Sequence, residues 1–212
     1  MNHSHHAAVG SESVTELCQR PLSLIGLLLV QVLIGYEWVI SGLTKVVRGG
    51  FPPGLADELR DTSQGSPGWY VKILDYIVIP HGQVFGYLIE IGELLVGILL
   101  IGGALIWRFA WGRAPLSLRV ATLALIALSA LAGVFMNVNF HLADGSATSP
   151  WLLPGDPFSE GVDLDSLMAA IQIPLAAVAA GLLWRMWRLH ETGDSAAIGS
   201  ARSPRRHRRS QV

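Results

Sequence analysis

Four long apolar stretches constrain the fold of this chain more than any other feature. A bilayer core about 30 Å thick is crossed by about 20 apolar residues in a helix. Stretches of that length cover residues 22–47, 82–107, 116–140 and 167–187. Only 15% of the residues are charged, against roughly 25% in ordinary soluble domains. We therefore predict an all-α integral membrane protein, a four-helix bundle surrounded by lipid.

The distribution of charge predicts how the bundle is oriented. Three arginines lie at residues 108–119 and seven at residues 185–209, whereas residues 141–166 contain five acids and no Lys or Arg. Because Lys and Arg favour the cytoplasmic face, this pattern predicts a multi-pass plasma-membrane protein with both termini in the cytoplasm. The two links on the other side are predicted to form a small extracytoplasmic cap.

The chain divides into three parts around these spans. Residues 1–20 are predicted to be a cytoplasmic segment, residues 21–190 the transmembrane domain, and residues 191–212 a disordered tail. The tail ends in an arginine-rich run. An arginine cluster beside a cytoplasmic membrane surface favours anionic lipid over nucleic acid as its partner.

The link between the first two spans is too long for a tight turn. Its first part, residues 49–54, has the sequence GGFPPG and predicts a loop. Its later part, residues 69–79, predicts a short helix lying on the membrane or over the mouth of the bundle. The alternative is a fifth span, which is short and is interrupted by Lys72, Asp75 and Pro80.

The second span carries the most informative polar pattern. Glycines and glutamates recur in steps of three and four and so share one helical face: Gly82, Gly86, Glu90, Glu93 and Gly97. Small residues allow close helix packing, and the carboxyls are predicted to point into the bundle about 13 to 18 Å from its outer end. Intramembrane carboxyls are usually functional, and at least one of this pair is expected to carry a proton. The structural alternative is a pair of hydrogen bonds to neighbouring helices.

Further polar residues of the first three spans converge on the outer half of the bundle and predict a funnel. The residues predicted to handle protons are Glu37, Glu90 and Glu93. The residues predicted to hold a ligand's head group or an anion are Trp38, Lys45, His81, Asn137, Asn139 and His141. For Lys45 the alternative is snorkelling to the interface, and for Trp38 it is packing. We predict no metal site and no flavin, and the single cysteine, Cys18, excludes an internal disulfide.

Three of these segments resemble the DoxX/DoxD-like family of small four-helix membrane proteins. They are GYEWVISGLTK at residues 35–45 with Arg20 ahead of it, residues 86–97, and MNVNF at residues 136–140. The resemblance covers residues 20–187. It implies a membrane subunit that passes electrons from a thiosulfate-like sulfur compound or a partner protein to quinone, as in thiosulfate:quinone oxidoreductase.

The expected cofactor is therefore a non-covalently bound quinone, and the expected partners are the bilayer and a second subunit or soluble redox protein. Self-association into an oligomer is compatible with the pattern. Two alternatives use the same residues differently. A proton-coupled transporter of small solutes would employ the same carboxyls, and a non-catalytic scaffold would anchor soluble redox enzymes through the arginine-rich tail.

Overall fold

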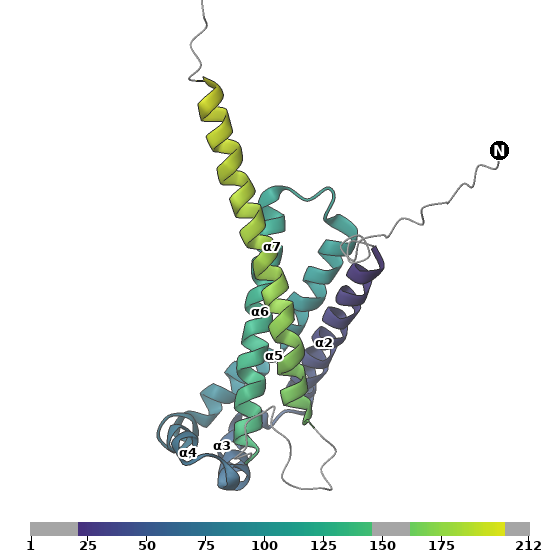
Figure 1. The fold of residues 1–212 in the computed structure, drawn as a ribbon. Coiled ribbons are helices and arrows are strands. Elements are labelled where there is room, and N and C mark those ends of the chain that lie inside the picture. The colour runs from purple at the N-terminus through teal and green to yellow at the C-terminus, as the bar shows by residue number, and fades with distance from the viewer. Residues whose placement is uncertain (1–20, 146–161, 202–212) are drawn as a thin grey trace, which may run out of the picture.

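The chain forms a bundle of long helices that flares at one end (Figure 1). The computed structural model describes residues 21–145 and 162–201. The helices are α2 (Pro21–Arg48), α3 (Phe51–Thr62), α4 (Gly68–Ile73), α5 (Gly82–Leu105), α6 (Leu116–Ala143) and α7 (Leu164–Ala201). The short helical turns are η1 (Ser63–Gly65), η2 (Leu74–Val78), η3 (Ile79–His81) and η4 (Ile106–Ala110).

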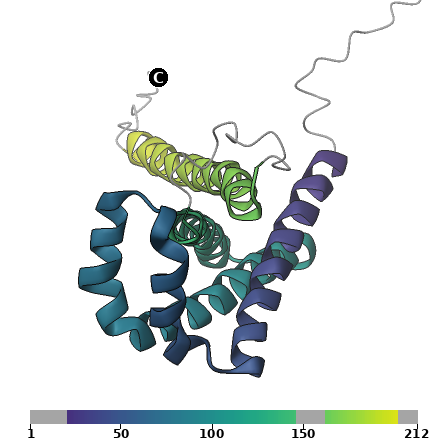
Figure 2. The same ribbon diagram turned by 90° about the horizontal axis from the view of Figure 1, so that it is seen from below.

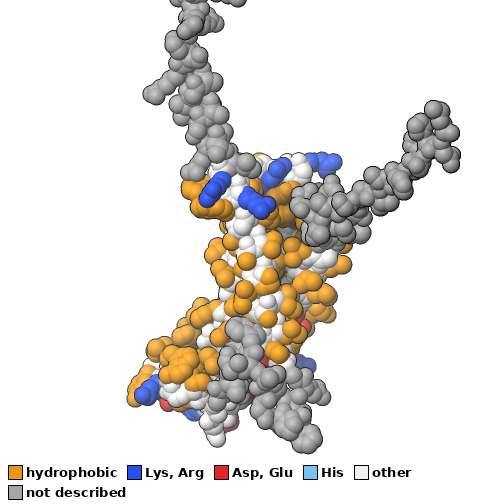
Figure 3. Space-filling model, viewed as in Figure 1, with side chains coloured by type: hydrophobic (Ala, Val, Ile, Leu, Met, Phe, Trp, Pro, Cys, Tyr) orange, Lys and Arg blue, Asp and Glu red, His pale blue; other side chains and the backbone are white. Residues whose placement is uncertain are grey.

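Four helical stretches in the described part of the chain are long and apolar enough to cross a membrane. They are Leu24–Arg48, Gly68–Ala110, Leu116–Ala143 and Leu164–Arg188. Hydrophobic side chains cover the shaft of the bundle (Figure 3), and many large ones, such as Leu33 and Leu128, are exposed. Exposed apolar surface on this scale needs lipid as its solvent. The predicted all-α, four-span architecture is confirmed.

The bundle is held together by neighbouring helix pairs. α2 packs on α5, α5 on α6, and α6 on α7. Its main core is apolar and centres on Ile34, Leu100, Leu123 and Leu175. A buried polar contact joins α2 to α5 beside this core: the Gln31 side-chain amide donates to the backbone oxygen of Leu100 at 2.8 Å.

The helix α3 was not predicted from the sequence. Gly49 and Gly50 adopt left-handed backbone angles, with φ of 67° and 81°, and so reverse the chain after α2. The helix then begins at Phe51, ahead of Pro52 and Pro53, although residues 49–54 were predicted to be a loop. Prolines at the start of a helix cost no hydrogen bond, because the first N–H groups have no partner there.

The short helix predicted over residues 69–79 is present as α4 and η2. Pro80 in η3 separates it from α5, with which it forms the helical stretch Gly68–Ala110. Figure 2 shows α3 and α4 side by side beneath one end of the bundle. Between them lies a second apolar core, built from Leu55, Leu59, Tyr70 and Leu74.

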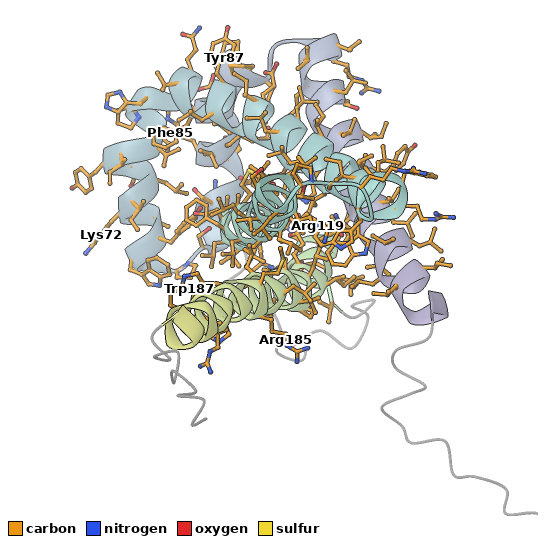
Figure 4. All side chains as sticks on the ribbon, turned by 90° about the horizontal axis from the view of Figure 1, so that it is seen from above. Lys72, Phe85, Tyr87, Arg119, Arg185 and Trp187 are labelled. Atoms are coloured by element: carbon orange, nitrogen blue, oxygen red, sulfur yellow. The ribbon has the colours of Figure 1, made fainter. Side chains whose placement is uncertain are left out.

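The opposite end of the bundle carries the arginines. Lys and Arg side chains gather at the top in Figure 3, and Figure 4, seen from that end, shows Arg185 pointing away from the bundle. Indole rings lie at the same end. The ring centroids of Trp107 and Trp111 stack 4.2 Å apart, and the Arg119 guanidinium lies 5.7 Å from the centroid of the Trp111 ring. Such a belt is typical of a membrane interface.

The last helix continues further than the sequence predicted. α7 runs from Leu164 to Ala201 and contains Pro174, so it extends past Glu191, where a disordered tail was predicted to begin. Residues 191–201 contain no proline that would stop a helix, and the next proline is Pro204. The predicted N-terminal segment 1–20 and the arginine run after Ala201 lie outside the described residues.

Candidate functional site

A cavity of about 490 Å³ lies where the bundle flares, between its helices and the α3–α4 pair. Its wall is mostly apolar and is formed on one side by Leu55, Leu74, Phe85 and Ile89. Its polar wall is built from Glu37, Trp38, Ser41, Lys45, Glu93, Asn137, Asn139 and Asp165. A cavity of this size and character suits one small molecule with an apolar body and a polar end.

The cavity reaches the molecular surface between η2 and α6. Ile77 and Phe135 line it and yet remain 51% and 69% exposed, so their side chains lie at its mouth. Glu37 of α2 and Leu164 of α7 are further lining residues that are exposed. Both Ile77 and Phe135 belong to stretches that are long and apolar enough to cross a membrane.

A buried ion pair forms the polar centre of the cavity. Lys45 Nζ donates to Glu93 Oε1 at 2.8 Å and to Oε2 at 2.7 Å, and also to Ser41 Oγ at 2.9 Å. The Glu93 side chain is 0% exposed, whereas Lys45 is partly exposed. An ammonium group has three protons, and all three are used by these partners. Lys45 therefore holds Glu93 and has no donor left for a ligand.

Glycines allow α2 and α5 to come close enough for this pair. A side chain at Gly42 would have its Cβ 2.9 Å from Leu94 Cγ and 3.1 Å from Glu93 Cβ. One at Gly97 would lie 2.6 Å from the backbone oxygen of Gly35. The small residues on the predicted face of the second span thus serve close packing, as the spacing indicated.

Trp38 supplies an unused hydrogen-bond donor. Its side chain is 3% exposed and its indole Nε1 finds no acceptor among the described residues. The ring lies 6.4 Å from that of Phe140, and both residues line the cavity. Because buried indole N–H groups normally have a partner, the Trp38 N–H is a natural place for a ligand's acceptor atom.

The two predicted asparagines have partners within the protein. Asn137 Nδ2 donates to Gln172 Oε1 at 3.0 Å, and Gln172 fits against Gly133, which has no side chain to obstruct it. Asn139 Nδ2 donates to the backbone oxygen of Phe135 at 2.7 Å, and its own Oδ1 accepts from the Tyr70 hydroxyl at 3.2 Å. Both side chains line the cavity. The Asn137–Gln172 bond joins α6 to α7, and the Tyr70–Asn139 bond joins α4 to α6.

The remaining predicted residues lie further from the ion pair. Glu90 is half-buried and is not a lining residue, and His81 is exposed and also does not line the cavity. His141 is buried at the end of α6, where Nδ1 lies 3.0 Å from Asp163 Oδ2. No group of three or more His, Cys, Asp or Glu that could hold a metal occurs within residues 21–145 and 162–201.

Sequence reasoning missed two features of the site. Asp165 lines the cavity from the first turn of α7, but it was assigned to the link because the apolar run begins only at Leu167. The available signal was Asp163 three residues before Ser166, which is the spacing of a helix N-cap. The pairing of Glu93 with Lys45 was also missed, although a buried carboxylate generally requires a partner.

Comparisons with protein-family models, with curated proteins and with solved structures give no match to this chain.

Proposed function

We propose that the chain is the membrane subunit of a redox system and binds the head group of a quinone in this cavity. The proposal agrees with the resemblance of residues 20–187 to DoxX/DoxD-like proteins. The observation that carries it is the unused Trp38 N–H in the wall of a mostly apolar cavity that reaches the surface between η2 and α6. A quinone carbonyl accepts such a hydrogen bond, while the apolar body of the molecule suits the aliphatic and aromatic lining.

The charges of the lining favour a neutral ligand. Among the described lining residues, three carboxyls (Glu37, Glu93 and Asp165) accompany a single ammonium, Lys45. That ammonium is already bound to Glu93. An anion such as thiosulfate would meet carboxylates without a free cation to offset them, which is costly in a low-dielectric site. Oxidation of a sulfur compound therefore belongs on a partner protein, and this chain receives only the electrons.

Glu93 is the residue suited to proton exchange with the bound ring. A quinone that receives two electrons from the partner's donor takes up two protons and becomes a quinol. The Glu93 carboxylate accepts two bonds from Lys45 and keeps lone pairs for a further donor, so it can accept from a quinol hydroxyl. Lys45 and Ser41 hold the carboxyl in position for this exchange, since a general acid or base must lie within hydrogen-bond reach.

Ligand binding is tested directly by thermal unfolding of the purified protein in detergent with a short-chain quinone analogue. A ligand that prefers the folded state raises the melting temperature with its concentration. Trp38→Phe removes the proposed donor but keeps the ring, and we expect quinone affinity to fall up to about tenfold, the equivalent of about 1.4 kcal/mol. Trp184→Phe, an exposed indole near the arginine-rich end, is the matched control and should bind like the wild type.

Two outcomes would contradict the proposal. No shift of the melting temperature at saturating quinone would leave the chain without the proposed ligand and would favour the scaffold. Equal loss of affinity in the Trp38 and Trp184 variants would show that the analogue binds outside the cavity.

A transporter has less support from the structure. A solute crossing the membrane would need a polar route from the cavity to the arginine-rich end. That half of the bundle is filled by an apolar core around Leu100, Leu123 and Leu175. The described polar side chains buried in this half include Gln31, Thr122 and Ser129, and none of them is ionisable.

A further inference from the structure

Asp165 is a carboxyl in the cavity wall to which quinone binding alone gives no role. It lies in the first turn of α7, is half-buried, and lines the cavity together with Glu93. Glu93 itself is fully buried and paired with Lys45. Each reduction cycle consumes protons in the cavity, so a supply from water is required.

A cluster of polar side chains lies next to Asp165 in the chain, at the end of the bundle opposite the arginines. Asp163 Oδ2 lies 3.0 Å from His141 Nδ1 and accepts from Ser166 Oγ at 2.7 Å. Ser166 Oγ also lies 3.3 Å from His141 Nδ1. The Asp163 side chain is 46% exposed, whereas His141 and Ser166 are buried. The cluster thus begins in water and ends inside the protein.

Asp165 adjoins this cluster in sequence and shares a cavity wall with the ion pair. It directly precedes Ser166 of the cluster in the chain, and it lines the same cavity as Glu93. Asp163, His141 and Asp144 are the other titratable groups near it at this end of the bundle. The other charged groups of the described cavity wall are Glu37 and Lys45 of α2. The cavity is large enough to hold water molecules, which carry a proton across the space between carboxyls.

We infer that Asp165 is a proton relay, which passes protons from the His141–Asp163–Ser166 cluster at the aqueous surface to Glu93 and the bound quinone. This inference rests on the proposed function. In each transfer Asp165 gives one proton to the cavity and regains one from water through the cluster, so its own state is restored. Two transfers, together with two electrons from the partner's donor, convert one quinone to one quinol.

The test reduces bound quinone electrochemically in films of the full-length protein, with a short-chain quinone analogue and soluble redox mediators that supply the electrons. Asp165→Asn should bind the analogue within about twofold of the wild type in thermal shift but be reduced at least about tenfold more slowly at pH 7. Its rate should rise about tenfold for each unit of pH decrease, because protons then arrive directly from solution. Asp165→Glu should restore most of the wild-type rate and pH profile.

Asp75→Asn, an exposed carboxyl on η2 away from the cavity, is the matched control and should behave like the wild type. An Asp165→Asn variant with the wild-type rate and pH profile would overturn the relay while leaving quinone binding intact. A wild type that binds no quinone would remove both proposals, and the thermal shift alone reveals that case. Loss of both binding and rate in Asp165→Asn, not recovered in Asp165→Glu, would assign the residue a structural role instead.

Discussion

Lys45 and Glu93 come from helices separated by 48 positions in the sequence, and the lysine ammonium contacts both oxygens of the carboxylate at 2.8 and 2.7 Å. Since Lys45 lies one turn from the end of α2, the pair fixes the level of α5 against that helix. It also fixes the position of the carboxyl that faces the cavity. Breaking the pair therefore affects stability and the site together.

Removing one partner of this pair should cost more than removing both. Lys45→Met leaves the Glu93 carboxylate buried without a cation, and we expect about 3 kcal/mol or more of lost stability. In the double variant Lys45→Met/Glu93→Met no buried charge remains, so a large part of that loss should be recovered. Thermal unfolding in detergent measures both. A double variant less stable than Lys45→Met would contradict the expected coupling.

Close packing of α2 on α5 predicts a sharp difference between two glycines of the same helix. Gly97→Ala places a Cβ 2.6 Å from the Gly35 oxygen and should lower stability by about 1–3 kcal/mol, the usual cost of overpacking. Gly102 has no atom within 4 Å of the position its Cβ would take, so Gly102→Ala should change stability little. Equal melting temperatures for the two variants would mean that the helices do not approach closely at Gly97.

Orientation in the membrane is predicted from the arginines and can be tested with single cysteines in a Cys18→Ser background. Gln64→Cys lies beside α3, and Gly112→Cys lies between η4 and α6. Both positions are exposed. An impermeant thiol reagent should label Gln64→Cys in intact cells and Gly112→Cys only after permeabilisation, because arginine-rich links stay in the cytoplasm. The reverse pattern would invert the topology, and with it the source of the relayed protons.

Asp163 predicts an acid-sensitive link between α6 and α7. Burial tends to raise the pKa of its carboxyl, but the hydrogen bonds from Ser166 and the nearby His141 outweigh this and hold the pKa below its usual 3.8. A lowered folded-state pKa stabilises the fold above pH 3.8, and this contribution is lost as the pH falls through the folded-state value. The melting temperature of Asp163→Asn should thus lie below that of the wild type at pH 6.

The same difference in melting temperature should shrink as the pH is lowered below 3.8 and the wild-type carboxyl takes up its proton. Asp61→Asn, an exposed carboxyl on α3, should follow the wild type at every pH. A constant difference between the Asp163 variant and the wild type across this range would show that the charge of Asp163 does not contribute.

The membrane-spanning architecture could be predicted because lipid imposes length and polarity on each span directly. The helical spacing also indicated correctly that Glu93 and Gly97 lie inside the bundle. The sequence did not predict how far one helix is shifted against its neighbour along the bundle axis. The prediction took Gly82 as the outer end of the second span and so placed Glu93 far below Lys45 in the bilayer. In the structure the helical stretch begins at Gly68, and Glu93 lies level with Lys45, to which it is paired. Such offsets depend on tertiary packing, which local periodicity does not encode.

Helix boundaries next to prolines and acids were also difficult to predict. Phe51 begins a helix ahead of two prolines, and Asp165 belongs to α7 although no apolar run includes it. In each case the residue types at the helix start are also typical of loops. The first N–H groups of a helix have no partner within the helix, so prolines and acidic side chains are favoured there. The proposed roles of Trp38 in ligand binding and of Asp165 in proton transfer depend on the cavity, which no single segment of the sequence reveals.

The opening of the cavity between η2 and α6 bears on which ligand concentration sets the occupancy of the site. A ligand that dissolves in the bilayer reaches Ile77 and Phe135 from the lipid rather than from water. Its relevant concentration is its mole fraction among the lipids, which for an apolar molecule far exceeds its aqueous concentration. Among the described lining residues Trp38 offers a free buried donor, and a site of this kind can then be well occupied despite weak intrinsic binding. In the proposed reaction, release of the quinol needs no strong driving force, because the reduced molecule returns to the same lipid pool.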